Sequence, residues 1–118
     1  MIIYDINYQL TNDIDWFIAD SNNTIVHFAS GGGILPKMVV ENIKSNILLI
    51  NFFREIQNNT DIIVNPTLIN YWPPKSISDE NLESFKQFAR KGIISFDKTY
   101  IDNPEDITYH MVTSPNVN

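Results

Sequence analysis

Hydrophobic residues recur at every second position in parts of this chain and at every third or fourth position in others, which separates predicted strands from predicted helices. Residues 1–10 alternate, with Ile2 and Tyr8 on the same face, and this pattern predicts a strand. Residues 14–19 and 24–29 are rich in aromatic and β-branched side chains. The polar residues between them favour a tight turn, so we predict a β-hairpin there.

A helical period covers residues 37–56, where Val40 and Ile43 begin an apolar stripe. We expect the second half of this segment to be deeply buried. Ser45-Asn46 would cap a second helix, so the segment is either one helix or two short ones.

A further helix is predicted to start after Ser78, because the acidic residues that follow favour the positive end of the helix dipole. Arg90 and Lys91 occupy its last turn, and Gly92 lies just beyond it. Its apolar face is formed by Leu82, Phe85, Phe88 and Ala89.

Further strands are predicted over residues 61–65, 93–96 and 107–112. Residues 66–76 are predicted to be loop, because Pro73-Pro74 does not fit inside a regular element. Strands neither alternate strictly with helices nor separate from them. The sequence therefore predicts an α+β fold with residues 1–118 as a single domain. Its sheet would be mostly antiparallel, with two or three helices packed on one face.

Composition restricts the classes of function. Acidic residues number 14 against 8 Lys and Arg, and the net charge is -6. The basic residues form no stripe that would neutralise phosphates, so nucleic acid and anionic membranes are disfavoured and a basic protein partner fits better. The absence of cysteine excludes disulfides, thiolate metal ligands and a cysteine nucleophile. No apolar run suits a membrane span or a signal peptide, so we expect a cytoplasmic protein, and the oligomeric state stays open.

The glycine turn formed by Gly31, Gly32 and Gly33 is the first candidate ligand site. A glycine-rich turn between a strand and a helix presents backbone N–H groups that cradle anions. The turn matches neither the dinucleotide-binding nor the P-loop pattern, so a flexible turn is the alternative and we predict no cofactor. The residues from Asp20 begin like a calcium loop but lack its glycine and glutamate, so no metal site is predicted.

His27 and His110 lie in different predicted strands. With an aspartate such as Asp97 they would offer ligands to a metal, although no local spacing supports one. Ser30 or Ser95 would complete a nucleophile–histidine–aspartate set, but the glycine-flanked serine of hydrolases is absent. We expect structural or surface histidines. The alternative is a small ligand-binding or enzymatic domain that uses the glycine turn with His27 or His110.

Carboxylates gather in two parts of the sequence, and an aromatic pair lies in the loop before the last predicted helix. A negative surface steers a basic partner, and exposed Trp is common in binding hot spots. The alternatives are solvated loops for the carboxylates and a core-covering role for the Trp. The candidate partner contacts are Asp13, Asp15, Asp20, Trp72, Asp102 and Glu105.

Residues 15–36 contain the elements Asp-Trp-Phe, Ala-Asp, His-Phe-Ala-Ser-Gly and Leu-Pro, and residues 91–115 contain Lys-Gly, Ser-Phe-Asp-Lys, Tyr-His and Ser-Pro. These two stretches make up less than half of the chain. In them the sequence resembles small bacterial proteins, some of them encoded in polymorphic-toxin loci as immunity-like proteins. The resemblance implies a non-enzymatic, stoichiometric protein that neutralises a toxin by binding it through an acidic surface. It carries no established active site. A third hypothesis is an accessory domain whose first strand pairs across a two-fold axis.

Overall fold

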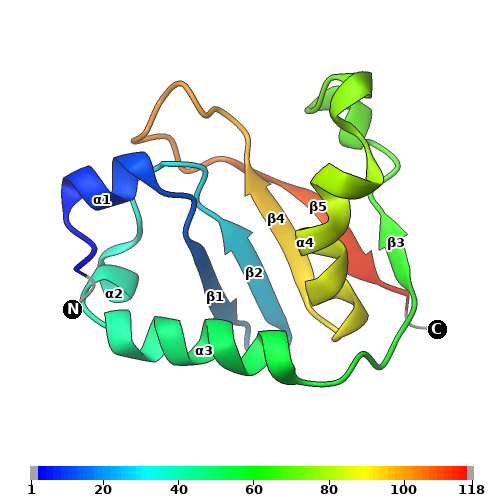
Figure 1. Cartoon of the computed structure of the whole chain (residues 1–118), viewed down its shortest axis with the longest axis horizontal. Helices are drawn as coiled ribbons and strands as arrows, with labels where there is room; N and C mark the ends of the chain where they lie inside the picture. Colours follow the sequence, from blue (N-terminus) through cyan, green and yellow to red (C-terminus); the bar gives the residue numbers. More distant parts are fainter. Residues whose placement is uncertain (1–2, 117–118) are drawn as a thin grey trace.

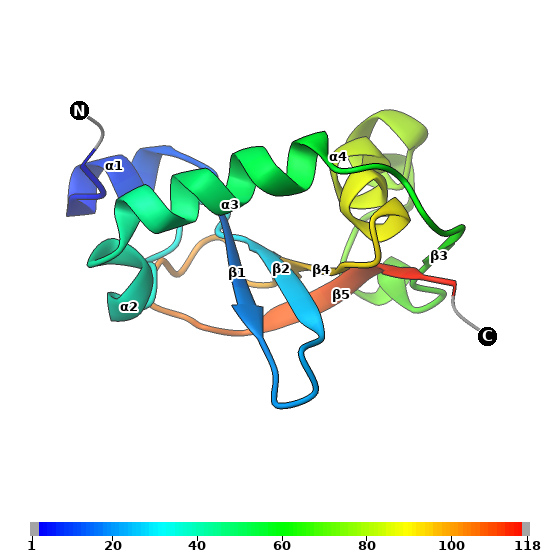
Figure 2. The same ribbon diagram turned by 90° about the horizontal axis from the view of Figure 1, so that it is seen from below.

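A five-stranded mixed sheet forms the centre of the computed structural model, which describes residues 3–116. The strands are β1 Asp15–Ala19, β2 Ile25–Ala29, β3 Ile62–Val64, β4 Ile94–Lys98 and β5 Tyr109–Pro115. The helices are α1 Ile6–Thr11, α2 Lys37–Val40, α3 Ile43–Glu55 and α4 Asp79–Arg90, and the short 3₁₀ turns are η1 Leu68–Asn70 and η2 Pro74–Ser76. Helices α3 and α4 lie on one side of the sheet, and α1 and α2 lie beyond its edge strand β1 (Figures 1 and 2). The predicted α+β class with a mostly antiparallel sheet is confirmed.

The order of strands in the sheet is β1-β2-β4-β5-β3. Neighbours are antiparallel except for β2 and β4, which run parallel. The predicted hairpin is confirmed as β1 and β2, and Asn23 in its turn has a φ of 60°. Asp20 Oδ1 accepts hydrogen bonds from the backbone N–H groups of Asn22 and Thr24 at 2.8 and 2.9 Å. The carboxylate of Asp20 therefore stabilises the turn itself.

The strand predicted at the N-terminus is wrong where the structure describes it, because residues 6–11 form helix α1. Asp5 caps this helix, and its Oδ1 accepts a hydrogen bond from the backbone N–H of Tyr8 at 2.8 Å. The rings of Tyr4 and Tyr8 stack with their centroids 5.7 Å apart. A spacing of four positions suits both a strand face and a helix face, so the alternation was an ambiguous signal. Ile2 lies outside the described residues.

The first predicted helical segment is two helices, because the chain turns between α2 and α3. Helix α3 begins after Asn42, not at the predicted cap Ser45-Asn46. The second half of the predicted segment 37–56 was expected to be deeply buried, and this is wrong for the outer side of α3. There Leu48 is 61% exposed, whereas Phe53 on the inner side is buried. The helix therefore covers the sheet with one face and leaves apolar side chains on the other.

Helix α4 begins and ends as the sequence predicts. Ser78 Oγ accepts a hydrogen bond from the backbone N–H of Asn81 at 3.2 Å, and all four residues of the predicted apolar face are buried. The hydroxyl of Thr113 on β5 donates to the carbonyl of Phe85 at 2.9 Å, which fixes the helix to the sheet. The segment before it is loop apart from η1 and η2, and η2 starts at Pro74, a position that needs no N–H donor.

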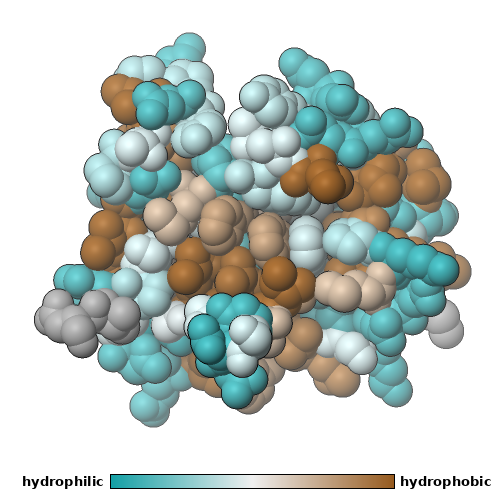
Figure 3. Space-filling view, turned by 180° about the vertical axis from the view of Figure 1, so that it is seen from behind, coloured by the Kyte–Doolittle hydropathy of each residue, from teal (hydrophilic) through white to brown (hydrophobic). Residues whose placement is uncertain are grey.

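An aromatic row crosses the face of the sheet opposite α3 and α4. Trp16, Phe28 and Phe96 lie on neighbouring strands, with successive ring centroids 4.2 and 5.5 Å apart. Tyr109 on β5 meets Trp16 and Phe28 edge-on, at 5.9 and 5.1 Å. The space-filling view from this side shows hydrophobic side chains gathered across its middle (Figure 3). This face is a contiguous apolar surface, which sets it apart from singly scattered hydrophobic residues.

Candidate functional site

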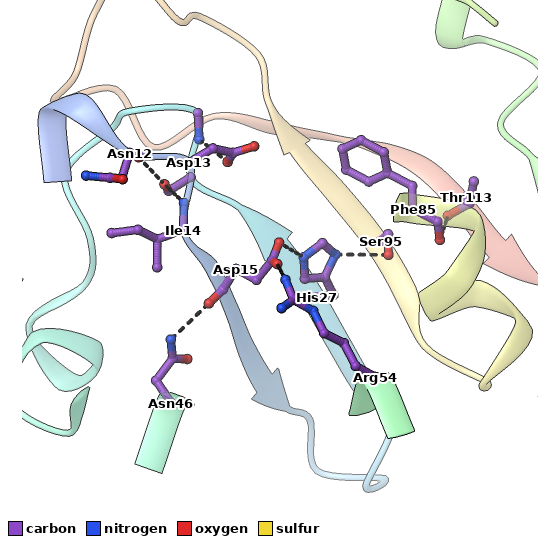
Figure 4. Close-up of polar contacts among 12 residues, drawn as sticks. Asn12, Asp13, Ile14, Asp15, His27, Asn46, Arg54, Phe85, Ser95 and Thr113 are labelled. Carbon is purple, nitrogen blue, oxygen red and sulfur yellow. Dashed lines mark hydrogen bonds and ion pairs between the residues drawn. The ribbon is translucent and has the colours of Figure 1, made fainter. Parts of the chain in front are cut away.

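Three side chains with the composition of a hydrolase triad meet on the helix-covered face of the sheet (Figure 4). Asp15 Oδ1 lies 2.7 Å from His27 Nε2, and His27 Nδ1 lies 3.0 Å from Ser95 Oγ. Arg54 of α3 donates a hydrogen bond to Asp15 Oδ2 at 3.3 Å. Ser95 is one of the two nucleophile candidates predicted from the sequence. Strand pairing brings His27 and Asp15 to it.

Burial makes this network structural. Ser95 is fully buried and His27 is 1% exposed, and the ring of Phe88 stacks on the imidazole at a centroid distance of 4.2 Å. A substrate therefore has no open route to Ser95 Oγ. Ser30, the other nucleophile candidate, is also buried, and its hydroxyl accepts a hydrogen bond from the backbone N–H of Ile14 at 2.7 Å. The hydrogen-bonded network satisfies buried polar groups and joins α3 to the sheet.

The glycine turn binds a carboxylate of the protein itself. Asp13 Oδ1 accepts a hydrogen bond from the backbone N–H of Gly31 at 2.9 Å, and the Gly33 N–H donates to a backbone carbonyl at 2.8 Å. Gly31 and Gly32 have φ values of 56° and 77°, which favour glycine. A Cβ on Gly33 would lie 2.9 Å from Cδ of Lys98. The turn is thus packed against a lysine stem, and Asp13 occupies an N–H group that an external anion would use.

The strand β4 separates the two histidines, because His27 lies on β2 and His110 on β5. Trp72 Nε1 donates a hydrogen bond to His110 Nε2 at 2.9 Å, and His110 Nδ1 lies 2.9 Å from Thr99 Oγ1. These contacts assign a neutral imidazole with its hydrogen on Nδ1, and burial lowers the pKa of His110. Within residues 3–116, no three side chains of His, Asp or Glu gather in a way that would hold a metal ion.

The six predicted partner contacts fall into different settings. Asp15 belongs to the buried network, and Asp20 belongs to the hairpin turn at the far end of β1. Trp72 is half-buried, and its ring meets Phe85 edge-on at 5.9 Å, so it covers the rim of the core. Besides Asp20, three carboxylates of the set are exposed: Asp13, Asp102 and Glu105.

These three carboxylates share one end of the sheet. The loop between β4 and β5 carries two of them, and its Pro104 carbonyl accepts a hydrogen bond from the Ile34 N–H at 2.8 Å. That bond joins the loop to the segment that follows the glycine turn, whose Gly31 binds the third carboxylate. We call this region the acidic end, defined by Asp13, Asp102 and Glu105.

An apolar groove of about 830 Å³ opens beside the acidic end. Its floor consists of Trp16, Phe28 and Tyr109, and its walls come from α1, residues 34–36 and the loop between β4 and β5. The wall residues Ile6, Leu10 and Ile107 are 59%, 43% and 83% exposed. Among the described residues that line the groove, Glu105 alone carries charge. Exposed apolar side chains gathered around one cavity are typical of a binding surface.

Two polar groups lie in the floor of the apolar groove. Trp16 is 7% exposed, and its Nε1 is buried with no hydrogen-bond partner among the described residues. Burial raises the pKa of the Tyr109 hydroxyl. The nearby indole N–H of Trp16 lowers this pKa, although it is not placed to form a hydrogen bond. A buried N–H without an acceptor is costly, so this indole nitrogen is an unsatisfied polar group beneath the surface of the groove.

The sequence pattern does not single out the groove. The alternating pattern predicts a strand for Ile6 and Leu10, although Asp5 followed by apolar residues four positions apart is also the signal of a capped helix. The pattern also predicts a strand from Ile107, whereas β5 begins only at Tyr109. No local signal brings these residues to Trp16, since the loop between β4 and β5 approaches β1 only through the tertiary fold.

Comparisons with known proteins supply no relative: no family model matches the chain, and neither a curated protein nor a solved structure matches it significantly. No helix within residues 3–116 has the length and hydrophobicity needed to cross a bilayer.

Proposed function

We propose that this chain is a non-enzymatic binding protein that holds a basic protein partner at the acidic end, as an immunity protein holds its toxin. The observation that carries the proposal is the apolar groove bordered by exposed carboxylates. Binding energy would come from burial of the apolar walls, and charge would select the partner and speed its approach. The occupant we expect is a partner segment with apolar side chains flanked by Lys or Arg.

Charge complementarity supports this choice of occupant. The chain carries a net charge of -6, and neither Asp13, Asp102 nor Glu105 makes an ion pair with a described residue. Other carboxylates of the chain, including Asp79 and Glu83 on α4, do form ion pairs. Carboxylates without a cation nearby are available to a basic partner. An acidic segment would meet repulsion at the same place.

The first experiment identifies the partner. The tagged chain is purified from its native host, and bound proteins are identified and counted by mass spectrometry. A stoichiometric basic protein is expected. If that protein inhibits growth when produced alone, its co-production with this chain should restore growth. A preparation without any stoichiometric protein partner would contradict the proposal.

The second experiment locates the contact by measuring the affinity of that partner for matched variants. Ile107→Ser removes an exposed groove side chain and should weaken binding about tenfold, since burying such a side chain is worth roughly 1.5 kcal/mol or more. Ile69→Ser removes an equally apolar residue of η1 that is 58% exposed and lies outside the groove, and it should leave the affinity unchanged. Equal effects of the two substitutions would place the contact elsewhere.

The third experiment tests the charge. The double substitution Asp102→Asn with Glu105→Gln should slow association and reduce its dependence on salt. Glu55→Gln with Asp61→Asn removes the same charge from exposed positions outside the groove and serves as the control. Identical association rates for both double variants would rule out steering by the acidic end.

A further inference from the structure

A second, smaller pocket of about 290 Å³ lies on the helix-covered side of the same sheet. Its aromatic wall comes from the segment between η1 and η2, which supplies Tyr71 and Trp72. Asn81 from the first turns of α4 lies on another side. The strands contribute Asp97 of β4 and His110 of β5, which face each other in the sheet register. The pocket thus brings four separate parts of the chain together.

Asp97 is the group in this pocket that lacks a counter-charge. It is half-buried, and no ion pair joins it to a described Lys or Arg. Burial raises the pKa of its carboxyl to about 7, and the nearby Asp13 adds to this effect. The backbone N–H of Lys98 and the indole of Trp72 act in the opposite direction but do not cancel it.

Three of the donor groups that line the pocket already have acceptors elsewhere. The Trp72 indole donates to His110, whose lowered pKa keeps it neutral. The amide nitrogen of Asn81 donates to the carbonyl of Ser76 at 2.9 Å, which leaves its oxygen as an acceptor. The ammonium of Lys98, which also lines the pocket, donates to the backbone carbonyl of Asp106 in the loop between β4 and β5. The two basic side chains of the pocket are therefore engaged, and its remaining groups are aromatic rings, hydroxyl groups and the amide of Asn81, none of which is a cation.

We propose that this pocket binds an organic cation, a guanidinium or primary ammonium group, with Asp97 as its counter-ion and Tyr71 and Trp72 as its aromatic walls. A cation over an aromatic face is attracted by the ring quadrupole, and a carboxylate adds a charge-assisted hydrogen bond. The volume lies at the small end of ligand sites, which suits one such group and its stem. The inference is independent of the apolar groove, which lies on the other face of the sheet.

Proton linkage gives the site a distinctive pH dependence. A cation binds the ionised form of Asp97, and this form is the minor one below pH 7. His110, which is neutral, and the ammonium of Lys98, which is engaged elsewhere, do not supply the compensating charge. The other titratable groups that act on Asp97 or line its pocket are Asp13, Tyr71 and Tyr109, and none of them is a cation. Affinity should therefore rise with pH and level off once Asp97 is ionised.

The test uses the indole N–H signals of the two tryptophans in a two-dimensional NMR spectrum, assigned with Trp72→Phe. The probes are methylguanidinium and blocked arginine (N-acetyl-arginine methylamide), with acetate at equal ionic strength as the anion control. The Trp72 signal should shift saturably with either cation and stay in place with acetate, while the Trp16 signal should not move. The affinity should be about tenfold higher near pH 8 than near pH 6, because the competent ionised fraction rises by that factor.

Matched variants separate the site from general charge. Asp97→Asn should abolish the saturable shift, whereas Asp102→Asn, which removes an equal charge from the exposed loop, should retain it. Tighter binding of blocked arginine would assign the site to a protein side chain, and tighter binding of methylguanidinium would assign it to a small free cation. A Trp72 signal that does not respond, that responds equally to acetate, or that responds in Asp97→Asn would overturn the inference.

Discussion

Replacement of Asp97 by asparagine should stabilise the fold at neutral and alkaline pH and leave it nearly unchanged in acid. The carboxyl of Asp97 has a pKa of about 7 in the folded chain, against an ordinary value of 3.8. Between these two values the folded state holds a proton that the unfolded state has released. Stability contributed by this group therefore falls as the pH rises from 3.8 to about 7 and stays low above that.

The size of the effect follows from the same difference. The two pKa values lie roughly three pH units apart, and each unit corresponds to about 1.4 kcal/mol, so the ionised carboxylate costs at most about 4 kcal/mol. Partial exposure lets water screen the charge, which brings the expected gain on substitution to about 2–4 kcal/mol above pH 7. Asparagine resembles the protonated carboxyl in shape and charge, so the gain should vanish below about pH 4.

Urea unfolding followed by tryptophan fluorescence measures this difference directly. The parent chain and Asp97→Asn are compared near pH 3.5 and near pH 8, on either side of the range in which the change is expected. Asp102→Asn is the control, since Asp102 is exposed and its replacement should shift stability by only a few tenths of a kcal/mol. An Asp97→Asn effect of equal size at both pH values, or a destabilisation near pH 8, would refute the reasoning.

Four other substitutions test the fold through the same unfolding assay. His27→Ala should cost about 3 kcal/mol because it breaks the buried network, and a loss below about 1 kcal/mol would show that the network contributes little. Gly33→Ala should cost about 1–3 kcal/mol because its Cβ overlaps the stem of Lys98, and a neutral result would mean that the turn relaxes freely. Phe53→Ala should cost about 3–4 kcal/mol, whereas Leu48→Ala on the outer side of α3 should stay below about 1 kcal/mol; similar losses would contradict the exposed position of Leu48.

Local chemistry explains which elements were predictable. The hairpin and α4 were found because their turn and cap residues act on immediate neighbours, as Asp20 and Ser78 do. The N-terminal helix was missed because Tyr4 and Tyr8 fit both periods. The outer side of α3 was misjudged because an apolar side chain such as Leu48 records hydrophobicity, not what lies opposite it.

The candidate sites depend on tertiary contacts that composition does not reveal. In the sequence, Asp97 is one of several carboxylates. Only the pairing of β4 with β5 next to Trp72 shows that it lies in a pocket without an ion-pair partner. The partner of Ser95 was equally undetermined until β2 placed His27 beside it. Strand neighbours far apart in sequence decide both environments, and hydrophobic periodicity carries no information on strand order.

The parallel contact between β2 and β4 has a consequence for how the chain folds. It is the one strand pairing, among the described residues, between the part that ends with α3 and the part that begins with β3, and it brings together His27 and Ser95, 68 positions apart. Such a distant contact forms late, because the intervening chain must be ordered or closed into a loop first. Each part has antiparallel pairings of its own: β1 with β2, and β5 with β3 and β4. Two chains refolding at high concentration should therefore exchange these parts, and their dimers would be domain-swapped across this seam.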